Sequence, residues 1–560
     1  MFTLFRFGTF RVSLDRYCLR RPSHPSVATA TTLSAARLAK TRYDPGIERI
    51  LVLDIGTSGL RAAVVSEDAR IIDVNYAAFP PSLPAPGLVE FDPVKLAATA
   101  VELARSVLAR SGPVKCVGIT NQRASTVVWD RSTGEPVAPG VGWQDLRTVA
   151  RCLELEASGV RLTPNASATK LAHLLELARA RAGPTGLQSG DICFGTLDTW
   201  IAWVLAGGAV PGVNPPNLEQ SRARAVHVTD WTNAAVTGLV STGTPGWDLD
   251  LLSVLDIPLA IMPEIVDSAG IVAEARALGT SAPIAALVGD QQASLIGQGC
   301  IHEGMAKITF GTGGMLDQCV GTRPPESVAS NEWGPNGTIP IIAWARDGQL
   351  TWGIEAMMIS AGAAVDWLCD SLGILASPAD SQSAAASCND SAGVWFVPAL
   401  IGLGTPVWDF GARGAFFGLT RGSTAAHLAR AVLEGIAHRG ADLVDAAEAD
   451  SHLAIDTIRV DGGMSANRVF LQALADATGR CVEVSPITEA TTLGAAYLAG
   501  VACGVWRDEE QTARLWSPGV VVEPDTSPRA AQHREEARAN WFKARKAAEG
   551  TIPELSALHF

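Results

Sequence analysis

The first segment that could carry chemistry places a carboxylate and two hydroxyl side chains directly after an apolar run. Asp54 ends the run that starts at Arg49, and Gly56-Thr57-Ser58-Gly59 follow it. A tight turn after a buried strand can aim several backbone N–H groups at one point and bind phosphate without basic side chains. The pattern predicts Mg²⁺ at Asp54, held through water, and phosphate oxygens at Thr57, Ser58 and Arg61. An ordinary β-turn explains this segment equally well when it is taken alone.

Glycine turns in the second half of the chain offer similar chemistry. Gly311-Thr312 follow the apolar run Ala306–Phe310, in the same way as the first turn. Gly463 lies in a strand, turn and helix pattern that ends at Asn467, and Gly362 stands where a helix could begin. Glycine at such positions lets a flat base or a ribose approach the backbone closely.

Asp290 is placed to act as a general base. It follows the apolar run Pro283–Val288 inside Gly289-Asp290-Gln291-Gln292, so we expect it at a strand end where a loop meets a cleft. A carboxylate there could accept the proton of a substrate hydroxyl. Aspartate before a helical run is also a good N-cap, so Asp290 could cap a helix from Ala293 onward. Both roles can hold at once.

Arg123 and Trp143 each follow a short apolar run and could form one wall of a ligand pocket. Arginine can hydrogen-bond the oxygens of a polyol while tryptophan packs against its carbon atoms. A surface salt bridge for Arg123 and a core position for Trp143 are the simpler readings of each residue alone.

The elements that must hold these residues predict an α/β fold with mixed sheets. The runs 49–54 and 60–65 read as a hairpin, and a second hairpin starts at Ala306, which suggests a duplicated domain. Helical patterns lie between the strands, at 93–109, 168–182 and 425–449. A final charged helical pattern, 529–548, offers Trp541 and Phe542 for docking, and the stretch 207–225 reads as a surface loop.

Length, charge and composition exclude several classes of protein. A chain of 560 residues exceeds the ~250 to 300 residues at which single cores stop growing, so two domains and a cleft are expected. A net charge of −13 argues against a nucleic-acid binder, and the apolar runs fall short of the ~18 residues that span a bilayer. Ten scattered cysteines indicate reduced thiols and a cytoplasmic protein.

The first 47 residues differ from the rest because basic residues far outnumber acidic ones. Arginine and lysine are interspersed there with Ser, Thr and Ala, and Asp15 is the one acid before Asp44. Such a composition is typical of an organelle transit peptide, which would make the location mitochondrial. A disordered tail or a start codon placed too far upstream explains it as well.

Nine ordered motifs, from about Glu48 to Trp541, resemble the FGGY carbohydrate kinases and within them the glycerol kinases. They are LDIGTSGLR from Leu53, GITNQR from Gly118, GTLDTW from Gly195, VHVTDWTNA from Val226, GDQQA from Gly289, GMAKITFGTG from Gly304, GLGTPVWDFGARGAFFGLTRG from Gly402, VDGGMSAN from Val460 and TTLGAAYLAG from Thr491.

The resemblance implies a two-lobed actin-like (ribonuclease H-like) ATPase fold with a duplicated mixed-sheet domain and ATP in the cleft between the lobes. It implies transfer of the γ-phosphoryl group to a primary hydroxyl of a small polyol, with glycerol as the first candidate. The implied segments are a basic tail at 1–47, an N-terminal lobe at 48–298, a C-terminal lobe at 299–516 and an extension with a helix at 517–560.

The resemblance also assigns roles to single residues. Asp290 is then the general base and Asp54 organises Mg²⁺. The polyol site is lined by Arg123, Trp143, Asp290 and Gln291. The nucleotide site is formed by Thr57, Ser58, Arg61, Gly311, Thr312, Gly362, Gly463 and Asn467. Such kinases are often homo-oligomers, dimers or tetramers, and no residue here decides this.

Four positions depart from the glycerol kinase pattern. Ala124 stands where an acidic residue grips glycerol hydroxyls, and Asn165 stands in place of a tyrosine. Met315 replaces an aromatic residue after the glycine turn, and Asp366 replaces a glutamine near the adenine site. A kinase for another sugar or sugar alcohol, or a non-catalytic actin-like ATP-binding protein, therefore stays an alternative.

Overall fold

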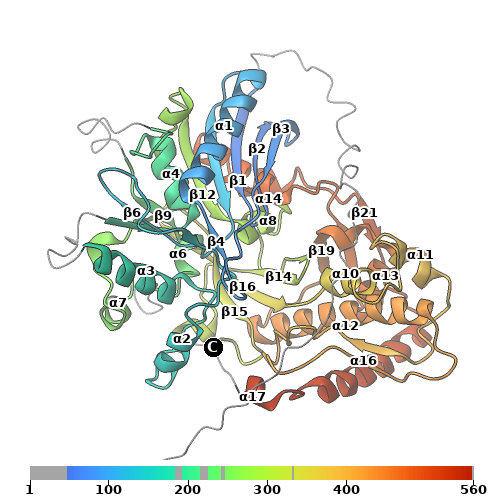
Figure 1. The fold of residues 1–560 in the computed structure, drawn as a ribbon. Coiled ribbons are helices and arrows are strands. Elements are labelled where there is room, and N and C mark those ends of the chain that lie inside the picture. The colour runs from blue at the N-terminus through green and yellow to red at the C-terminus, as the bar shows by residue number, and fades with distance from the viewer. Residues whose placement is uncertain (1–46, 183–191, 215–224, 241–245, 331–332, 558–560) are drawn as a thin grey trace, which may run out of the picture. The chain divides into compact units, whose positions relative to one another are not determined.

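A computed structural model describes residues 47–182, 192–214, 225–240, 246–330 and 333–557 (Figure 1). Residues 1–46 of the predicted basic tail (1–47) and residues 215–224 of the expected loop (207–225) lie outside the described residues. The structure therefore does not test the predictions made for them. In the described part of the chain, no helix combines the length and the apolar character that a membrane span requires.

The central element of the described chain is one mixed sheet of thirteen strands. Its strands, in spatial order, are β21 (Val520–Val522), β20 (Cys481–Val484), β19 (Thr457–Asp461), β13 (Ala306–Phe310), β14 (Gly314–Gly321), β16 (Gln349–Met358), β15 (Ile339–Arg346), β11 (Ala269–Glu274), β12 (Pro283–Gly289), β5 (Cys116–Asn121), β1 (Arg49–Ile55), β2 (Gly59–Ser66) and β3 (Ile71–Ala78). The expected α/β class with a mixed sheet is confirmed.

The larger helices lie between these strands in the sequence, except for the last one, α16, which follows β21. They are α1 (Pro93–Ser111), α3 (Ser167–Ala182), α4 (Leu197–Ala206), α8 (Asp290–Gly297), α10 (Gly362–Asp370), α12 (Ala425–Ser451), α13 (Arg468–Thr478), α14 (Ala490–Ala502) and α16 (Pro528–Ala548). The predicted helices at 93–109, 168–182, 425–449 and 529–548 are confirmed, with ends shifted by at most two residues.

The sheet repeats one strand pattern twice, as the two hairpins predict. In the order β3-β2-β1-β5-β12 the first two contacts are antiparallel and the next two are parallel. The order β16-β14-β13-β19-β20 has the same sequence of contacts. The two series meet through β11 and β15, which pair at the single position Ala269–Arg346. The topology therefore supports a duplicated, two-domain, actin-like fold.

Each half of the duplication ends in a helix, and these two helices cross at glycine. α8 follows β12, and α14 follows β20. A Cβ atom added to Gly297 would lie 1.9 Å from the carbonyl oxygen of Ala490, and one added to Gly494 would lie 1.8 Å from that of Ala293. The contact is reciprocal, because each glycine meets the residue four positions before the other. Backbone thus approaches backbone at a distance that no other residue allows.

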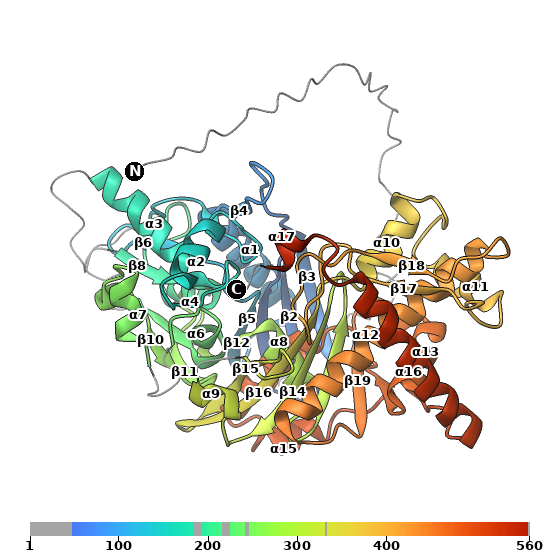
Figure 2. The ribbon, with the colours of Figure 1, turned by 90° about the horizontal axis from the view of Figure 1, so that it is seen from below.

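Layers of helices cover the sheet. α14 packs against β1, β5 and β12, and α1 packs against β2 and β3. At the other end of the sheet, α12 packs on α13 and β16, and α16 crosses both α12 and α13 (Figure 2). The α14 contact is tight, since a Cβ atom on Gly118 of β5 would lie 2.7 Å from the carbonyl oxygen of Ala495.

The C-terminal helix α16 docks through a buried tryptophan and a shared carboxylate. Trp541 stacks on His438 of α12, and its indole Nε1 donates to Asp442 at 3.1 Å. Burial alone would raise the pKa of Asp442, but Arg439, Arg538 and Arg545 hold it at about 2. The expected docking by Trp541 is confirmed, whereas Phe542 remains 54% exposed.

The expectation that Asp290 caps a helix starting at Ala293 is wrong. α8 begins at Asp290 itself, and Gly289 occupies the N-cap position. The Asp290 carboxylate accepts a hydrogen bond from the N–H of Gln291, the very next residue, at 2.9 Å. The apolar run Pro283–Val288 therefore leads directly into the helix, and the carboxylate lies at its first position.

Replacement of Gly494 by alanine tests the helix crossing. We expect Gly494→Ala to lower the thermal midpoint by the equivalent of about 1–3 kcal/mol, because its methyl group would overlap the backbone of α8. Gly422→Ala is the control, since it is exposed and a Cβ atom there would meet only Thr420 Oγ1, at 3.6 Å. Equal midpoints for the two variants, measured by calorimetry, would contradict the crossing.

Candidate active site

Three parallel strands bring the predicted site residues of the first half to one edge of the sheet. The register of β1, β5 and β12 places Asp54 beside Thr120 and Thr120 beside Val288. Asp54, Arg123 and Asp290 therefore all lie at the carboxyl ends of neighbouring strands, where open α/β sheets bind their ligands.

Arg123 lies between two carboxylates, one from each half of the fold. Its Nη2 atom is 2.7 Å from Glu355 Oε2 on β16, and its Nε atom is 3.6 Å from Asp290 Oδ1. The sulfur atom of Met315 on β14 lies 3.7 Å from the same Nη2 atom. The Nη1 atom is buried and has no hydrogen-bond partner among the described residues. Arg123 thus keeps one N–H donor without a protein partner, and its ion pairs are largely buried, so the alternative of a surface salt bridge is wrong.

Burial sets the protonation of both carboxylates beside Arg123. It raises the pKa of Asp290 above its ordinary value, against the lowering effect of Arg123. It raises the pKa of Glu355 to about 7, again opposed by Arg123. A carboxylate with a raised pKa is a stronger base, so this environment favours Asp290 as a group that takes up a proton.

Asp54 forms a second charged group with Arg61 and Glu489. Arg61 Nη1 is 3.0 Å from Asp54 Oδ2 and also pairs with Glu489, the residue before α14. Burial raises the pKa of Asp54 to about 6, partly offset by Arg61.

No group of three or more metal-binding side chains occurs among the described residues. Asp54 alone still fits Mg²⁺, because its side chain is 13% exposed and Mg²⁺ usually binds one or two carboxylates together with the phosphates of a substrate.

Trp143 is anchored to the first glycine turn and to a buried lysine. Its Nε1 atom donates to Thr57 Oγ1 at 3.2 Å, so the predicted polyol and phosphate residues meet here. Lys170 Nζ donates to the carbonyl oxygens of Trp143 and Asn165, at 2.9 and 3.0 Å. The Asn165 amide also donates to the Trp143 carbonyl, at 3.1 Å.

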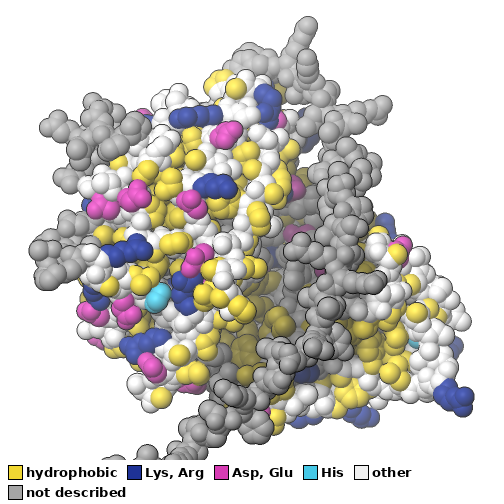
Figure 3. All heavy atoms as spheres, in the orientation of Figure 1, with side chains coloured by type: hydrophobic (Ala, Val, Ile, Leu, Met, Phe, Trp, Pro, Cys, Tyr) yellow, Lys and Arg dark blue, Asp and Glu magenta, His cyan; other side chains and the backbone are white. Residues whose placement is uncertain are grey.

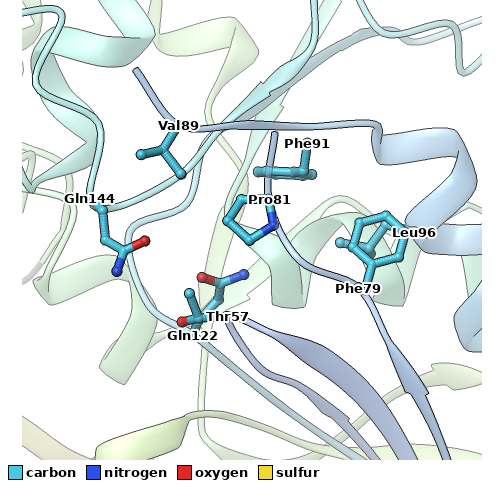
Figure 4. Close-up of a pocket in the computed structure, with 9 residues that line it drawn as sticks. Thr57, Phe79, Pro81, Val89, Phe91, Leu96, Gln122 and Gln144 are labelled. Carbon is cyan, nitrogen blue, oxygen red and sulfur yellow. The ribbon is translucent and has the colours of Figure 1, made fainter. Parts of the chain in front are cut away.

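A cavity of about 10 Å³, the size of one water molecule, adjoins Thr57 (Figure 4). Gln122, Gln144 and Thr57 present polar groups on one side of it, and Phe79 and Phe91 lie on the other.

Backbone contacts hold the predicted nucleotide residues of the second half together. The N–H of Gly362, at the start of α10, donates to the Gly311 carbonyl at 2.9 Å, and Ala361 donates to Thr312 at 2.8 Å. A Cβ atom on Gly362 would lie 2.6 Å from the Gly311 oxygen, so this approach needs glycine. Gly463 opens into free space, as a ligand surface would.

Asn467 has a structural task that the sequence did not indicate. Its side chain accepts hydrogen bonds from the N–H groups of Val469 and Phe470 at the start of α13, and it donates to Ser381 at 3.1 Å. Asn467 is therefore an N-cap, and a role in nucleotide binding stays a prediction.

Several buried charges of the site were missed from sequence. Glu355 and Lys307 are each the single charged residue of a largely apolar run, 349–358 and 306–310. A lone charge in such a run could have indicated a buried, functional side chain. Gln291, predicted to bind the polyol, accepts a hydrogen bond from Lys307 at 2.6 Å. Glu489 gave no signal, because it lies in a polar segment.

The buried Lys170 predicts a pH-dependent stability. Burial lowers its pKa to about 7 from 10.5, so above pH 7 the unfolded chain binds the extra proton and stability rises with pH up to about 10. We expect the thermal midpoint of the wild type to rise relative to that of Lys170→Met between pH 7 and 9.5. A constant difference between the two proteins would contradict a neutral Lys170.

Comparison with known proteins agrees with this geometry. Residues 49–297 match the N-terminal domain, and residues 306–503 the C-terminal domain, of the FGGY family of carbohydrate kinases. The chain is 41% identical to a glycerol kinase of Aromatoleum aromaticum, over 90% of this chain and 99% of that protein. It is 37% identical to glycerol kinase 2 of Thermotoga maritima, over 88% and 97%.

Solved structures show the same fold. Plasmodium falciparum glycerol kinase with ADP superposes with a TM-score of 0.79 and 26% identity, over 92% of this chain and 99% of that chain. A ligand-bound xylulose kinase from Lactobacillus acidophilus gives a TM-score of 0.75 at 21% identity, over 89% and 98%. This chain belongs to the FGGY family of carbohydrate kinases.

Proposed function

We propose that this protein transfers the γ-phosphoryl group of ATP to a primary hydroxyl of glycerol. The observation that carries the proposal is Asp290, a partly exposed carboxylate with a raised pKa at the first position of α8, whose Oδ1 atom lies 3.6 Å from Arg123 Nε. The glycerol kinases with about 40% identity over most of the chain support glycerol as the acceptor.

Asp290 takes the proton of the attacking hydroxyl. Phosphoryl transfer needs little covalent help from the protein, so positioning and charge stabilisation provide most of the catalysis. Arg123 offers its unpaired Nη1 donor to an acceptor oxygen, and the Trp143 ring packs against the carbon atoms. Gln291 supplies a further hydrogen bond.

The nucleotide lies along the glycine turns. Thr57, Ser58 and Arg61 address phosphate oxygens from the first half. From the second half, Gly311, Thr312, Gly362, Gly463 and Asn467 hold the nucleotide. Asp54 would hold Mg²⁺, which neutralises phosphate charge when bound. Arg61 then exchanges its carboxylate partners, Asp54 and Glu489, for phosphate.

A cytoplasmic location and a homo-oligomeric state are parts of the proposal that rest on the family alone. On the face shown in Figure 3, acidic and basic side chains are interspersed over the described residues. That mixture fits a small-molecule substrate better than nucleic acid.

The acceptor is the part of the proposal that most needs a direct test. Ala124 brings no polar group to the site, and the Asn165 amide donates to the backbone of Trp143. ADP release with Mg·ATP should therefore be measured with glycerol, dihydroxyacetone, erythritol, xylitol, ribulose and xylulose. Strong stimulation by glycerol supports the proposal. Stronger stimulation by another acceptor indicates a kinase of a different sugar or sugar alcohol. No stimulation by any acceptor indicates a non-catalytic ATP-binding protein.

Removal of the proposed base should abolish transfer without abolishing nucleotide binding. We expect Asp290→Asn to lower kcat by about 10²- to 10⁴-fold, because the amide cannot take the hydroxyl proton. ATP affinity, measured by calorimetry, should stay within about twofold, since Asp290 does not bind the nucleotide. Asp347→Asn is the control, because that side chain is 87% exposed. Near-normal turnover of Asp290→Asn would refute the assignment.

Restoration of an acidic residue at position 124 should strengthen glycerol binding. Ala124 has a φ of +59° and already carries a Cβ atom, so Ala124→Glu adds little backbone strain. A new carboxylate-to-hydroxyl hydrogen bond should lower the KM for glycerol about tenfold. Ala124→Gln, which has nearly the same size but no charge, should lower it less. Unchanged KM values in both variants would mean that position 124 does not face the acceptor.

A further inference from the structure

A fully buried ion pair contacts Gln291, a residue of the proposed acceptor site. Lys307 on β13 and Asp317 on β14 are both 0% exposed, and Lys307 Nζ is 2.6 Å from Asp317 Oδ2. Such a pair adds little stability compared with two apolar residues of similar size, because both charges must leave water. Stability alone therefore does not explain this pair, and the other contacts of Lys307 indicate its role.

Two further hydrogen bonds of Lys307 connect it to the start of α8. Its Nζ donates to Gln291 Oε1 at 2.6 Å and to Thr309 Oγ1 at 3.0 Å. Gln291 and Thr309 thus accept two of the three N–H groups of the ammonium, and the Asp317 carboxylate neutralises its charge at 2.6 Å. The ammonium is therefore held beside Gln291.

The contact also determines which end of the Gln291 amide faces away from Lys307. A lysine ammonium can only donate, so it must meet the amide oxygen. The NH₂ group of Gln291 is then the part that remains to bind an oxygen of the acceptor. Gln291 follows Asp290 in the chain, so this donor lies next to the proposed base.

The hydrogen bond joins the two halves of the protein. Gln291 lies in the segment that matches the N-terminal family domain, and Lys307 lies in the segment that matches the C-terminal one. Lys307 is also on the strand that leads into the turn at Gly311. A residue of the nucleotide-binding half therefore orients a residue of the acceptor-binding half.

We propose that Lys307, neutralised by Asp317, is a positioning residue that orients the Gln291 amide so that its NH₂ group meets an oxygen of the acceptor. This inference rests on the proposed kinase function, because it concerns the acceptor of that reaction. Lys307 does not contact the acceptor in this proposal. It acts through Gln291.

The test compares steady-state kinetics of four variants, with ADP release as the readout. Lys307→Met combined with Asp317→Leu removes both charges and leaves no buried carboxylate unpaired. Gln291→Leu removes the amide, and a third protein carries all three changes. Gln291→Glu keeps an oxygen for Lys307 but has no NH₂ group.

We expect the double, triple and both single-site variants to raise the KM for the acceptor about tenfold, with the KM for ATP within about twofold of the wild type. The triple variant should be no worse than Gln291→Leu, because the residues act as one unit. A matched control is Asp442→Asn, which disrupts another buried ion pair, Arg439–Asp442 at 2.9 Å. It should lower the thermal midpoint and leave the acceptor KM unchanged.

The outcomes separate the inference from the proposed function. If the wild type shows no acceptor-stimulated turnover, both are wrong. If the wild type turns over but the folded charge-free double variant keeps a normal acceptor KM, the inference alone is wrong. Should the double variant fail to fold, Gln291→Glu decides, because a normal acceptor KM in that variant would show that the NH₂ group is not used.

Discussion

The reciprocal glycine contact between α8 and α14 is the constraint on which the rest of the site depends. Asp290 is the first residue of α8, and Glu489 immediately precedes α14. The two helices cross where Gly297 meets Ala490 and Gly494 meets Ala293. Each contact is thus made within two turns of a charged site residue. The close approach of the two backbones at this crossing therefore fixes the positions of Asp290, the proposed base, and of Glu489, the partner of Arg61.

The site contains charged side chains in buried positions, where the loss of contact with water is unfavourable. Glu355, Lys307 and Asp317 are buried on β13, β14 and β16, strands that otherwise read as apolar. Their burial is tolerated because each carboxylate meets a cation, Arg123 or Lys307. Local departures from good packing rules often occur at functional sites, and these three buried charges lie close to Asp290 and Arg123. The duplicated sheet brings cations and anions from opposite halves to one place.

Much of the fold was predictable because it depends on short-range patterns. Apolar runs followed by glycine turns identified β1, β2, β12 and β13, and they placed Asp54 and Asp290 correctly at strand ends. The start of α8 was mispredicted by three residues, because the glycine before Asp290 serves as the N-cap. The partners of Arg123 could not be predicted, since Glu355 is 232 residues away and only the register of the whole sheet brings it near. Gly494 looked like one small residue in an apolar helix, and nothing in its neighbourhood indicates which helix it meets.

The placement of α14 also bears on whether the halves of this protein are separable. α14 belongs to the segment that matches the C-terminal family domain, yet it covers β1, β5 and β12 of the N-terminal one. A fragment that stops at residue 297 would leave the apolar surface of these strands open to water, and such surfaces drive aggregation. The two halves therefore repeat one strand pattern, yet each depends on the other to bury its apolar surface.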